Sequence, residues 1–159
     1  MQELRESAAC NGSVCGRVFS RKNELSIQLA GISGTLFCVS FRILAVDHVQ
    51  IAAPKGCEPA ARKFYGEILG MMEIAKPAEL RTRGGCGFQC GTQQLHIGVE
   101  DDFRPAKKAH PAFNVENLDT LRESLLAAGI QVVNDDAIPG VSRFYVADPF
   151  GNRLEFQSA

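Results

Sequence analysis

A pattern that occurs twice limits most what this chain can fold into. From residue 44 to residue 159, the alternation of apolar and polar residues predicts a strand, a helix and three more strands, and then the same order again. The first copy has expected strands at 46–51, 71–75, 86–90 and 93–100, with a helix from Pro59 to Gly70. The second has strands at 110–115, 130–133, 142–147 and 153–157, with a helix between the N-cap Asn117 and Gly129. The repeat predicts an α+β domain of two βαβββ modules, about 44–101 and 109–159.

The segment before this domain has a different character. Residues 1–43 contain Ser, Gly, Asn and scattered charges, without a sustained helical or strand period. Such a segment has little apolar surface to bury on one face. We therefore predict a poorly ordered N-terminal extension over 1–43 and a single folded domain over 44–159.

All three histidines of the chain lie at equivalent positions of the two copies. His48 opens the first copy and His110 opens the second, while His96 and Glu155 stand near their ends. The intervals are similar, because 96 − 48 = 48 and 155 − 110 = 45. Since side chains alternate along a strand, each histidine is expected on the face opposite its apolar neighbours. The repeat thus predicts that these four side chains lie on the polar side of the sheet.

Three imidazoles and a carboxylate are suitable ligands for a borderline divalent metal ion such as Zn, Ni, Fe, Mn or Co. Four protein ligands on an octahedral ion leave two positions for water or substrate, which is typical of a catalytic site. A single histidine on a strand is more often a surface residue or a hydrogen-bonded polar residue than a ligand. The joint placement of His48, His96, His110 and Glu155 favours the metal site over that alternative.

The last expected strand follows a tight turn, Asp148–Asn152, in which Pro149 and Gly151 supply the two required backbone conformations. Along that strand Glu155 points to the face opposite its apolar neighbours. On the preceding strand, Arg143 and Tyr145 share one face, which makes them candidates for substrate binding. An exposed arginine and a packed tyrosine are the equally weighted alternative. Phe88 is a third candidate for the cavity wall, although a core position is commoner for phenylalanine.

The composition limits the partners and the compartment. The net charge of −1 gives the whole chain no electrostatic attraction for nucleic acid or an anionic membrane. The most apolar stretch, 27–41, is interrupted by polar residues and is shorter than the ~20 apolar residues that span a bilayer. The six cysteines form neither a disulfide framework nor a paired zinc motif. We therefore expect a cytoplasmic protein with reduced thiols that binds neither nucleic acid nor a membrane.

Residues 44–159 resemble the vicinal oxygen chelate superfamily, which includes glyoxalase I, extradiol dioxygenases and bleomycin resistance proteins. The matching pieces are His48, His110, Phe64-Tyr65 with Leu69-Gly70, and above all the turn Asp148–Asn152 ahead of Glu155. The resemblance implies an open, barrel-like curved mixed sheet with helices outside and a divalent metal inside. His48, His110 and Glu155 match ligand positions of metal-dependent members, and His96 falls where glyoxalase I has a glutamate. A homodimer is expected, with the site inside one chain or shared between two.

The resemblance implies three functions. The first is a metal-dependent lyase or isomerase similar to glyoxalase I, which chelates vicinal oxygens and stabilises an enediolate, with Glu155 as the catalytic base. The second is an extradiol-type ring-cleaving dioxygenase, although His96 would crowd a site that must bind a diol and dioxygen together. The third is a metal-free protein that binds a small molecule or confers antibiotic resistance.

Overall fold

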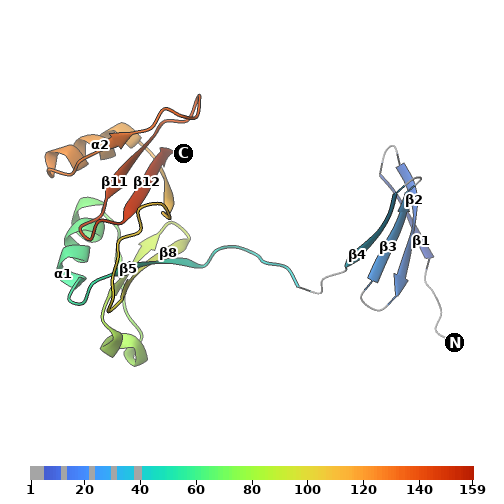
Figure 1. Cartoon of the computed structure of the whole chain (residues 1–159), viewed down its shortest axis with the longest axis horizontal. Coiled ribbons are helices and arrows are strands. Elements are labelled where there is room, and N and C mark those ends of the chain that lie inside the picture. Colours follow the sequence, from blue (N-terminus) through green and yellow to red (C-terminus); the bar gives the residue numbers. More distant parts are fainter. Residues whose placement is uncertain (1–5, 12–13, 22–23, 30–31, 38–40) are drawn as a thin grey trace. The chain divides into compact units, whose positions relative to one another are not determined.

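The computed structural model describes the backbone of residues 6–11, 14–21, 24–29, 32–37 and 41–159, and side chains from residue 41 onward. The chain divides into two units, Met1–Ala45 and Val46–Ala159 (Figure 1). In the first unit β1 (Glu6–Asn11), β2 (Val14–Arg21), β3 (Glu24–Leu29) and β4 (Ile32–Phe37) form an antiparallel sheet in chain order. The expected lack of order over 1–43 falls partly outside the described residues, and it stays a prediction.

The second unit begins with a βαβββ module. β5 (His48–Ala53) leads to α1 (Glu58–Ala61), which continues as the π-helical segment η1 (Arg62–Ile68). Then follow β6 (Glu73–Ile74), the 3₁₀ segment η2 (Ala78–Arg83), β7 (Cys86–Cys90) and β8 (Gln93–Val99). The sheet order is β5-β8-β7-β6, with β5 and β8 parallel.

The second module repeats this arrangement. It contains β9 (Ala112–Val115), α2 (Leu118–Ala127), β10 (Val133–Asn134), β11 (Arg143–Ala147) and β12 (Arg153–Ser158). Its sheet has the order β10-β11-β12-β9, with β9 and β12 parallel. The predicted pair of βαβββ modules is therefore confirmed, and β5 and β9, the first strand of each module, lie at sheet edges.

Two details of the second module differ from the expectation. Asn117 is not a side-chain cap of α2: it has a left-handed backbone, φ 58°, and its side chain makes no capping hydrogen bond. Asparagine adopts this conformation more readily than most residues. The strand expected from residue 130 begins only at Val133, because the Ile130 N–H closes α2 by donating to the Leu125 carbonyl at 2.9 Å.

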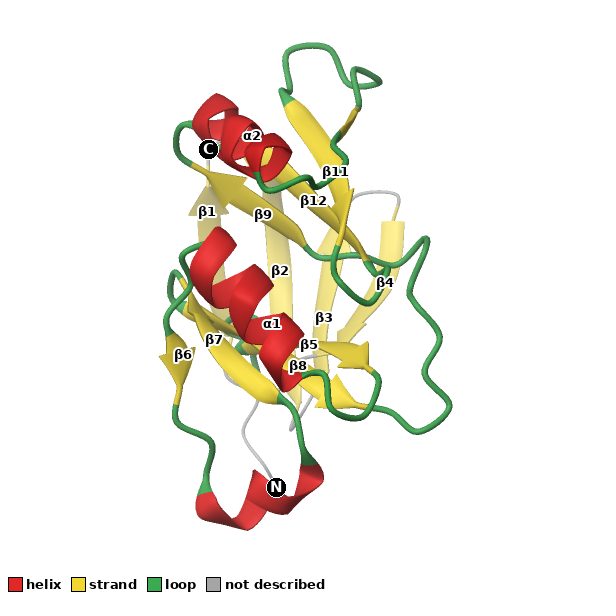
Figure 2. Cartoon of the chain, turned by 90° about the vertical axis from the view of Figure 1, so that its left-hand side faces the viewer, coloured by secondary structure: helices red, strands yellow, loops and turns green. Residues whose placement is uncertain are grey.

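The core lies between the helices and the apolar faces of the two sheets. Figures 1 and 2 show α1 and α2 on the same side of both sheets. The fully buried side chains under them include Tyr65, Phe88, Leu95, Phe144 and Phe156. Because strand side chains alternate, burying these residues turns the histidine-bearing face of each sheet away from the core. Within the described residues, no helix is both long and apolar enough to cross a bilayer.

Candidate metal and substrate site

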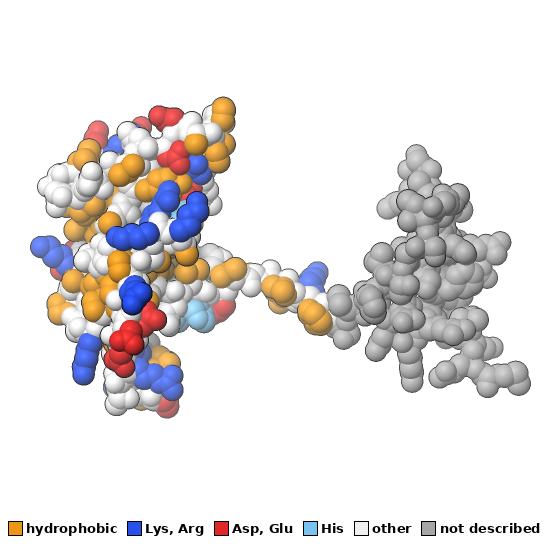
Figure 3. Space-filling model, viewed as in Figure 1, with side chains coloured by type: hydrophobic (Ala, Val, Ile, Leu, Met, Phe, Trp, Pro, Cys, Tyr) orange, Lys and Arg blue, Asp and Glu red, His pale blue; other side chains and the backbone are white. Residues whose placement is uncertain are grey.

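The polar face of the first sheet brings His48 and His96 together. The register of β5 against β8 pairs Gln50 with His96, so His48 lies diagonally across from His96. The two rings stack with centroids 4.4 Å apart and planes 18° from parallel. Histidine surface is visible on the face shown in Figure 3, and the His48 side chain is 46% exposed.

Each ring of this pair is held by a neighbour. His48 Nδ1 lies 2.9 Å from Asp47 Oδ2, and His96 Nε2 lies 2.9 Å from Gln94 Oε1. Partial burial, followed by the nearby His48 ring, lowers the pKa of His96 below its usual value. The uncharged imidazole, which is the form that binds metals, is therefore favoured at His96.

The polar face of the second sheet brings His110 and Glu155 together. His110 Nε2 lies 2.9 Å from Glu155 Oε2, and His110 Nδ1 lies 2.7 Å from the Lys108 carbonyl oxygen. Both partners are oxygen acceptors, so each nitrogen of the ring faces an oxygen atom. The contact through Nδ1 fixes the ring orientation, and Nε2 is the nitrogen that would face a metal cation.

Glu155 is a buried carboxylate, only 6% exposed. Burial by itself would raise its pKa, but hydrogen bonds from His110 and Tyr145 and the charge of Arg143 hold the pKa below the usual value. Glu155 is therefore ionised at neutral pH, as a metal ligand or a proton acceptor must be.

Arg143 and Tyr145 lie on the same face as Glu155, as the strand alternation predicts, since Tyr145 pairs with Glu155 in the register of β11 and β12. The Arg143 guanidinium donates to Asp135 Oδ2 at 2.9 Å and approaches Glu155 Oε1 at 3.5 Å. Its charge is thus largely compensated by these two carboxylates. Tyr145 meets the His110 ring edge-on, with centroids 5.5 Å apart.

The four predicted ligands form two pairs, one on each module. Among residues 41–159, where side chains are described, no group of three or more His, Cys, Asp or Glu side chains is placed to hold a metal ion. We call these two pairs, His48 with His96 and His110 with Glu155, half-sites. The metal site expected from the four side chains, inside one chain or shared between two, stays a prediction.

A pocket of about 580 Å³ adjoins the first half-site. Its wall includes His96, Gln94 and Gln50 on the polar face of the sheet, together with Lys76, which precedes η2, and Leu80, which lies within η2. Gly98 makes room for the Gln50 side chain, since a Cβ atom at Gly98 would lie 2.6 Å from Gln50 Nε2. This hollow can hold a small molecule next to His96.

Phe88 does not belong to this pocket. It is 0% exposed and packs in the core, with its ring centroid 5.6 Å from that of Tyr65. The reason is the strand period: Phe88 pairs with Leu95 on the apolar face, whereas Gly87 pairs with His96 on the polar face. The core alternative for Phe88 was the correct one.

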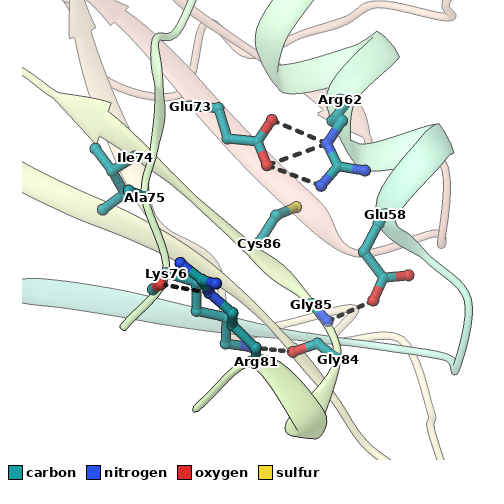
Figure 4. A pocket seen from close by; sticks show the side chains of 10 residues that line it. All are labelled: Glu58, Arg62, Glu73, Ile74, Ala75, Lys76, Arg81, Gly84, Gly85 and Cys86. Atoms are coloured by element: carbon teal, nitrogen blue, oxygen red, sulfur yellow. Dashed lines mark hydrogen bonds and ion pairs between the residues drawn. The ribbon is translucent and has the colours of Figure 1, made fainter. Parts of the chain in front are cut away.

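A second hollow, of about 540 Å³, contains none of the predicted site residues (Figure 4). Its polar groups are already engaged: Glu73 forms a bidentate pair with Arg62, and Glu58 Oε1 accepts the Gly85 N–H at 2.7 Å. The thiol of Cys86 is buried, and burial, with a smaller effect of Cys57, raises its pKa to about 11. Because the carboxylates are paired and burial keeps the Cys86 thiol protonated, we place the candidate site on the histidine faces.

The turn Asp148–Asn152 positions the strand of Glu155 through a buried network. Asp148 Oδ2 accepts the Tyr65 hydroxyl and the Asn152 amide, each at 2.9 Å. The Asn152 side chain also donates to the Ala52 carbonyl and accepts from the Ala106 N–H, both at 2.9 Å. These bonds connect the two modules, because Tyr65 and Ala52 belong to the first.

Four residues of the site were not identified from the sequence. Asp47 and Gln94 each orient a histidine, and Asp135 binds Arg143. Arg153 stacks on Tyr145. Strand alternation alone places Gln94 and Arg153 on the polar face, two residues before His96 and Glu155, and is the one signal that could have revealed them.

Comparisons with known proteins agree with this architecture. The family described as Glyoxalase/Bleomycin resistance protein/Dioxygenase superfamily matches residues 45–156. A crystal structure of a glyoxalase family protein from Bacillus anthracis is 57% identical, with a TM-score of 0.74, covering 76% of this chain and 98% of that one. A search of curated proteins found no match.

Two more distant structures share the fold. A glyoxalase family protein from Enterococcus faecalis is 25% identical, with a TM-score of 0.58, over 72% of this chain and 97% of that one. A lactoylglutathione lyase from Agrobacterium tumefaciens is 21% identical, with a TM-score of 0.58, over 72% of this chain and 93% of that one. At 21% identity the likeness concerns the fold alone.

Proposed function

Because the chain belongs to the Glyoxalase/Bleomycin resistance protein/Dioxygenase superfamily, we propose that it is a metal-dependent lyase or isomerase acting beside a carbonyl group. The observation that supports this most is the pair His110 and Glu155, 2.9 Å apart on a polar sheet face, matched by His48 and His96 on the other module. The substrate is a small molecule with two vicinal oxygens.

The donor set fits a divalent metal such as Zn, Ni, Fe, Mn or Co. Three imidazoles and one carboxylate are ligands that these borderline ions accept. Each imidazole also has a fixed outer contact, from Asp47, Gln94 or the Lys108 carbonyl, which is the usual arrangement around metal-binding histidines. When bound, the metal supplies electrostatic stabilisation of the enediolate oxygens.

We propose that the site is completed in a homodimer. Each chain has one pair of donors on each module, and β5 and β9, which begin the two modules, are sheet edges. Val46, which precedes β5, is 62% exposed, and Val49, which lies in β5, is 39% exposed. A two-fold axis that places the first module of one copy against the second module of its partner would create two identical four-donor sites.

The chain's own residues have separate roles in this proposal. Glu155 would accept the proton removed beside the carbonyl on leaving the metal, since its neighbours keep it ionised. Tyr145, edge-on to His110, and Arg143, which contacts both Glu155 and Asp135, hold that carboxylate in place. The free thiols of Cys57, Cys86 and Cys90 support a cytoplasmic location, where thiols stay reduced.

Metal analysis tests the first part of the proposal. Purified full-length protein dialysed against Zn²⁺ or Ni²⁺ should retain close to one ion per chain, and His110→Ala should abolish the uptake. Turnover of the methylglyoxal–glutathione hemithioacetal by the loaded protein tests the lyase activity. Absence of metal uptake would favour the metal-free binding protein, and oxygen consumption with a catechol under Fe²⁺ would favour the dioxygenase.

Mixed dimers test the shared site. His48→Ala and Glu155→Ala each remove one donor from every site of their own homodimer. When the two variants are unfolded together and refolded, a mixed dimer with shared sites has one site lacking both donors and one intact site. It should therefore bind one ion tightly. Sites contained within one chain would give a mixed dimer with no intact site.

A further inference from the structure

Arg153 occupies a defined position next to the second half-site. It lies on β12 two residues before Glu155 and therefore on the same face, about 7 Å along the strand. The repeat gives it a counterpart, since 155 − 153 = 2 and 96 − 94 = 2, and that counterpart, Gln94, contacts His96 directly. Arg153 is thus in the row of side chains that borders the proposed metal site.

The guanidinium of Arg153 is held by an aromatic ring. Its central carbon lies 3.7 Å from the centroid of Tyr145, and Tyr145 in turn contacts His110 edge-on. Stacking of this kind uses the flat face of the guanidinium and leaves its N–H edge available for hydrogen bonds. The side chain is therefore oriented before any ligand binds.

The two arginines of this face differ in their partners. Arg143 donates to Asp135 and approaches Glu155, so its charge is compensated inside the protein. Arg153 has no carboxylate within ion-pair distance among the residues whose side chains are described. One further cation lies just before β12, because the Lys107 ammonium donates to the Gly151 carbonyl at 3.0 Å.

We infer that Arg153 binds an anionic group of the substrate, a carboxylate or a phosphate. An oriented guanidinium with a free N–H edge is complementary to the two oxygens of such a group. The inference rests on the proposed function, because it places the anion relative to the chelated oxygens. The Cα atoms of Arg153 and Glu155 are about 7 Å apart along the strand, a distance that a spacer of roughly three methylene groups spans.

Binding of three hydroxamates to the metal-loaded full-length protein tests this assignment. Hydroxamates chelate a metal through two vicinal oxygens. The probes share a three-methylene spacer and end in a carboxylate, a phosphonate or a neutral carboxamide. Titration calorimetry of the Zn²⁺ form should show that one anionic probe binds at least about tenfold tighter than the carboxamide. The better of the two anionic probes identifies the anion.

Arg153→Gln should reduce that preference to less than about threefold, while the affinity for the carboxamide probe changes by less than about twofold. Lys107→Gln, which removes a neighbouring cation, is the matched control and should keep the preference. Equal binding of all three probes, or a preference that survives in Arg153→Gln, would overturn the assignment and leave the proposed function intact. Failure of every probe to bind the metal-loaded wild-type protein would overturn both.

Discussion

The buried amide of Asn152 is expected to be one of the most stabilising side chains of the domain. It is 2% exposed and makes three side-chain hydrogen bonds, with Ala52, Ala106 and Asp148, all at 2.9 Å. In Asn152→Ala, the Asp148 carboxylate keeps the Tyr65 hydroxyl and two backbone N–H donors. The Ala52 carbonyl and the Ala106 N–H lose their side-chain partner.

The magnitude follows from those two backbone groups. A buried polar group without a partner costs about 1–3 kcal/mol, and both groups here are partly buried, so Asn152→Ala should lower the free energy of unfolding by roughly 2–4 kcal/mol. Tyr65→Phe, which removes one hydrogen bond to a carboxylate, should cost about 1.5–3 kcal/mol. The two effects should not add, because both side chains bind Asp148 Oδ2.

Urea unfolding followed by far-ultraviolet circular dichroism measures these values, and the chain has no tryptophan for fluorescence. Asn114→Ala is the matched control, because the exposed Asn114 side chain accepts only a surface hydrogen bond from Gln157. It should change stability by less than about 0.5 kcal/mol. If Asn152→Ala also loses less than about 1 kcal/mol, with an unchanged dependence on urea, the network is not a stabilising connection between the modules.

Three further predictions concern the first module. Gly85→Ala should lower the free energy of unfolding by at least about 3 kcal/mol, since φ is +79° and the new Cβ would lie 2.1 Å from the Ile97 carbonyl oxygen. The control Gly91→Ala has φ +57° but open space around the new Cβ, so it should cost only about 1–2 kcal/mol in the same urea assay. Hydrogen bonds from the Glu58 N–H and the Gly85 N–H lower the pKa of the Glu58 carboxyl from 4.5. The ionised carboxylate therefore stabilises the fold fully above pH 4.5, and this effect disappears as the pH falls through the folded-state pKa. Glu58→Gln should be less stable than wild type at neutral pH and equal to it at strongly acidic pH, whereas the exposed control Glu67→Gln should show no such convergence. Cys86, with a pKa of about 11, should resist maleimide at pH 8 in the folded protein and react in urea, as mass spectrometry of the labelled peptides would show; rapid labelling without urea would contradict its burial.

The repeat made the fold predictable because it fixes strand order and strand faces together. Side-chain alternation placed His48 and His96 on one polar face and Glu155 with Arg143 and Tyr145 on another, as the registers confirm. The same rule placed Phe88 in the core once its partner Leu95 was known. Local periodicity was therefore sufficient for each half-site.

The relation between the half-sites was not predictable in the same way. How two modules pack depends on contacts between residues far apart in sequence, such as Tyr65 with Asp148, and no local period records them. Asn117 shows a second limit, because asparagine suits both a helix cap and a left-handed residue. Only the backbone conformation of Asn117 itself, with φ at 58°, decides between these roles.

The bond between Asn152 and Ala52 joins residues 100 positions apart, which has a consequence for synthesis. In a ribosome-bound first module, the Ala52 carbonyl on β5 faces water until the second module emerges. Contacts of such long range slow folding, because a large loop must close before they form. A newly made first module is thus expected to exist for some time with the apolar face of its sheet incompletely covered. During that time it should depend on chaperones more than the finished domain does.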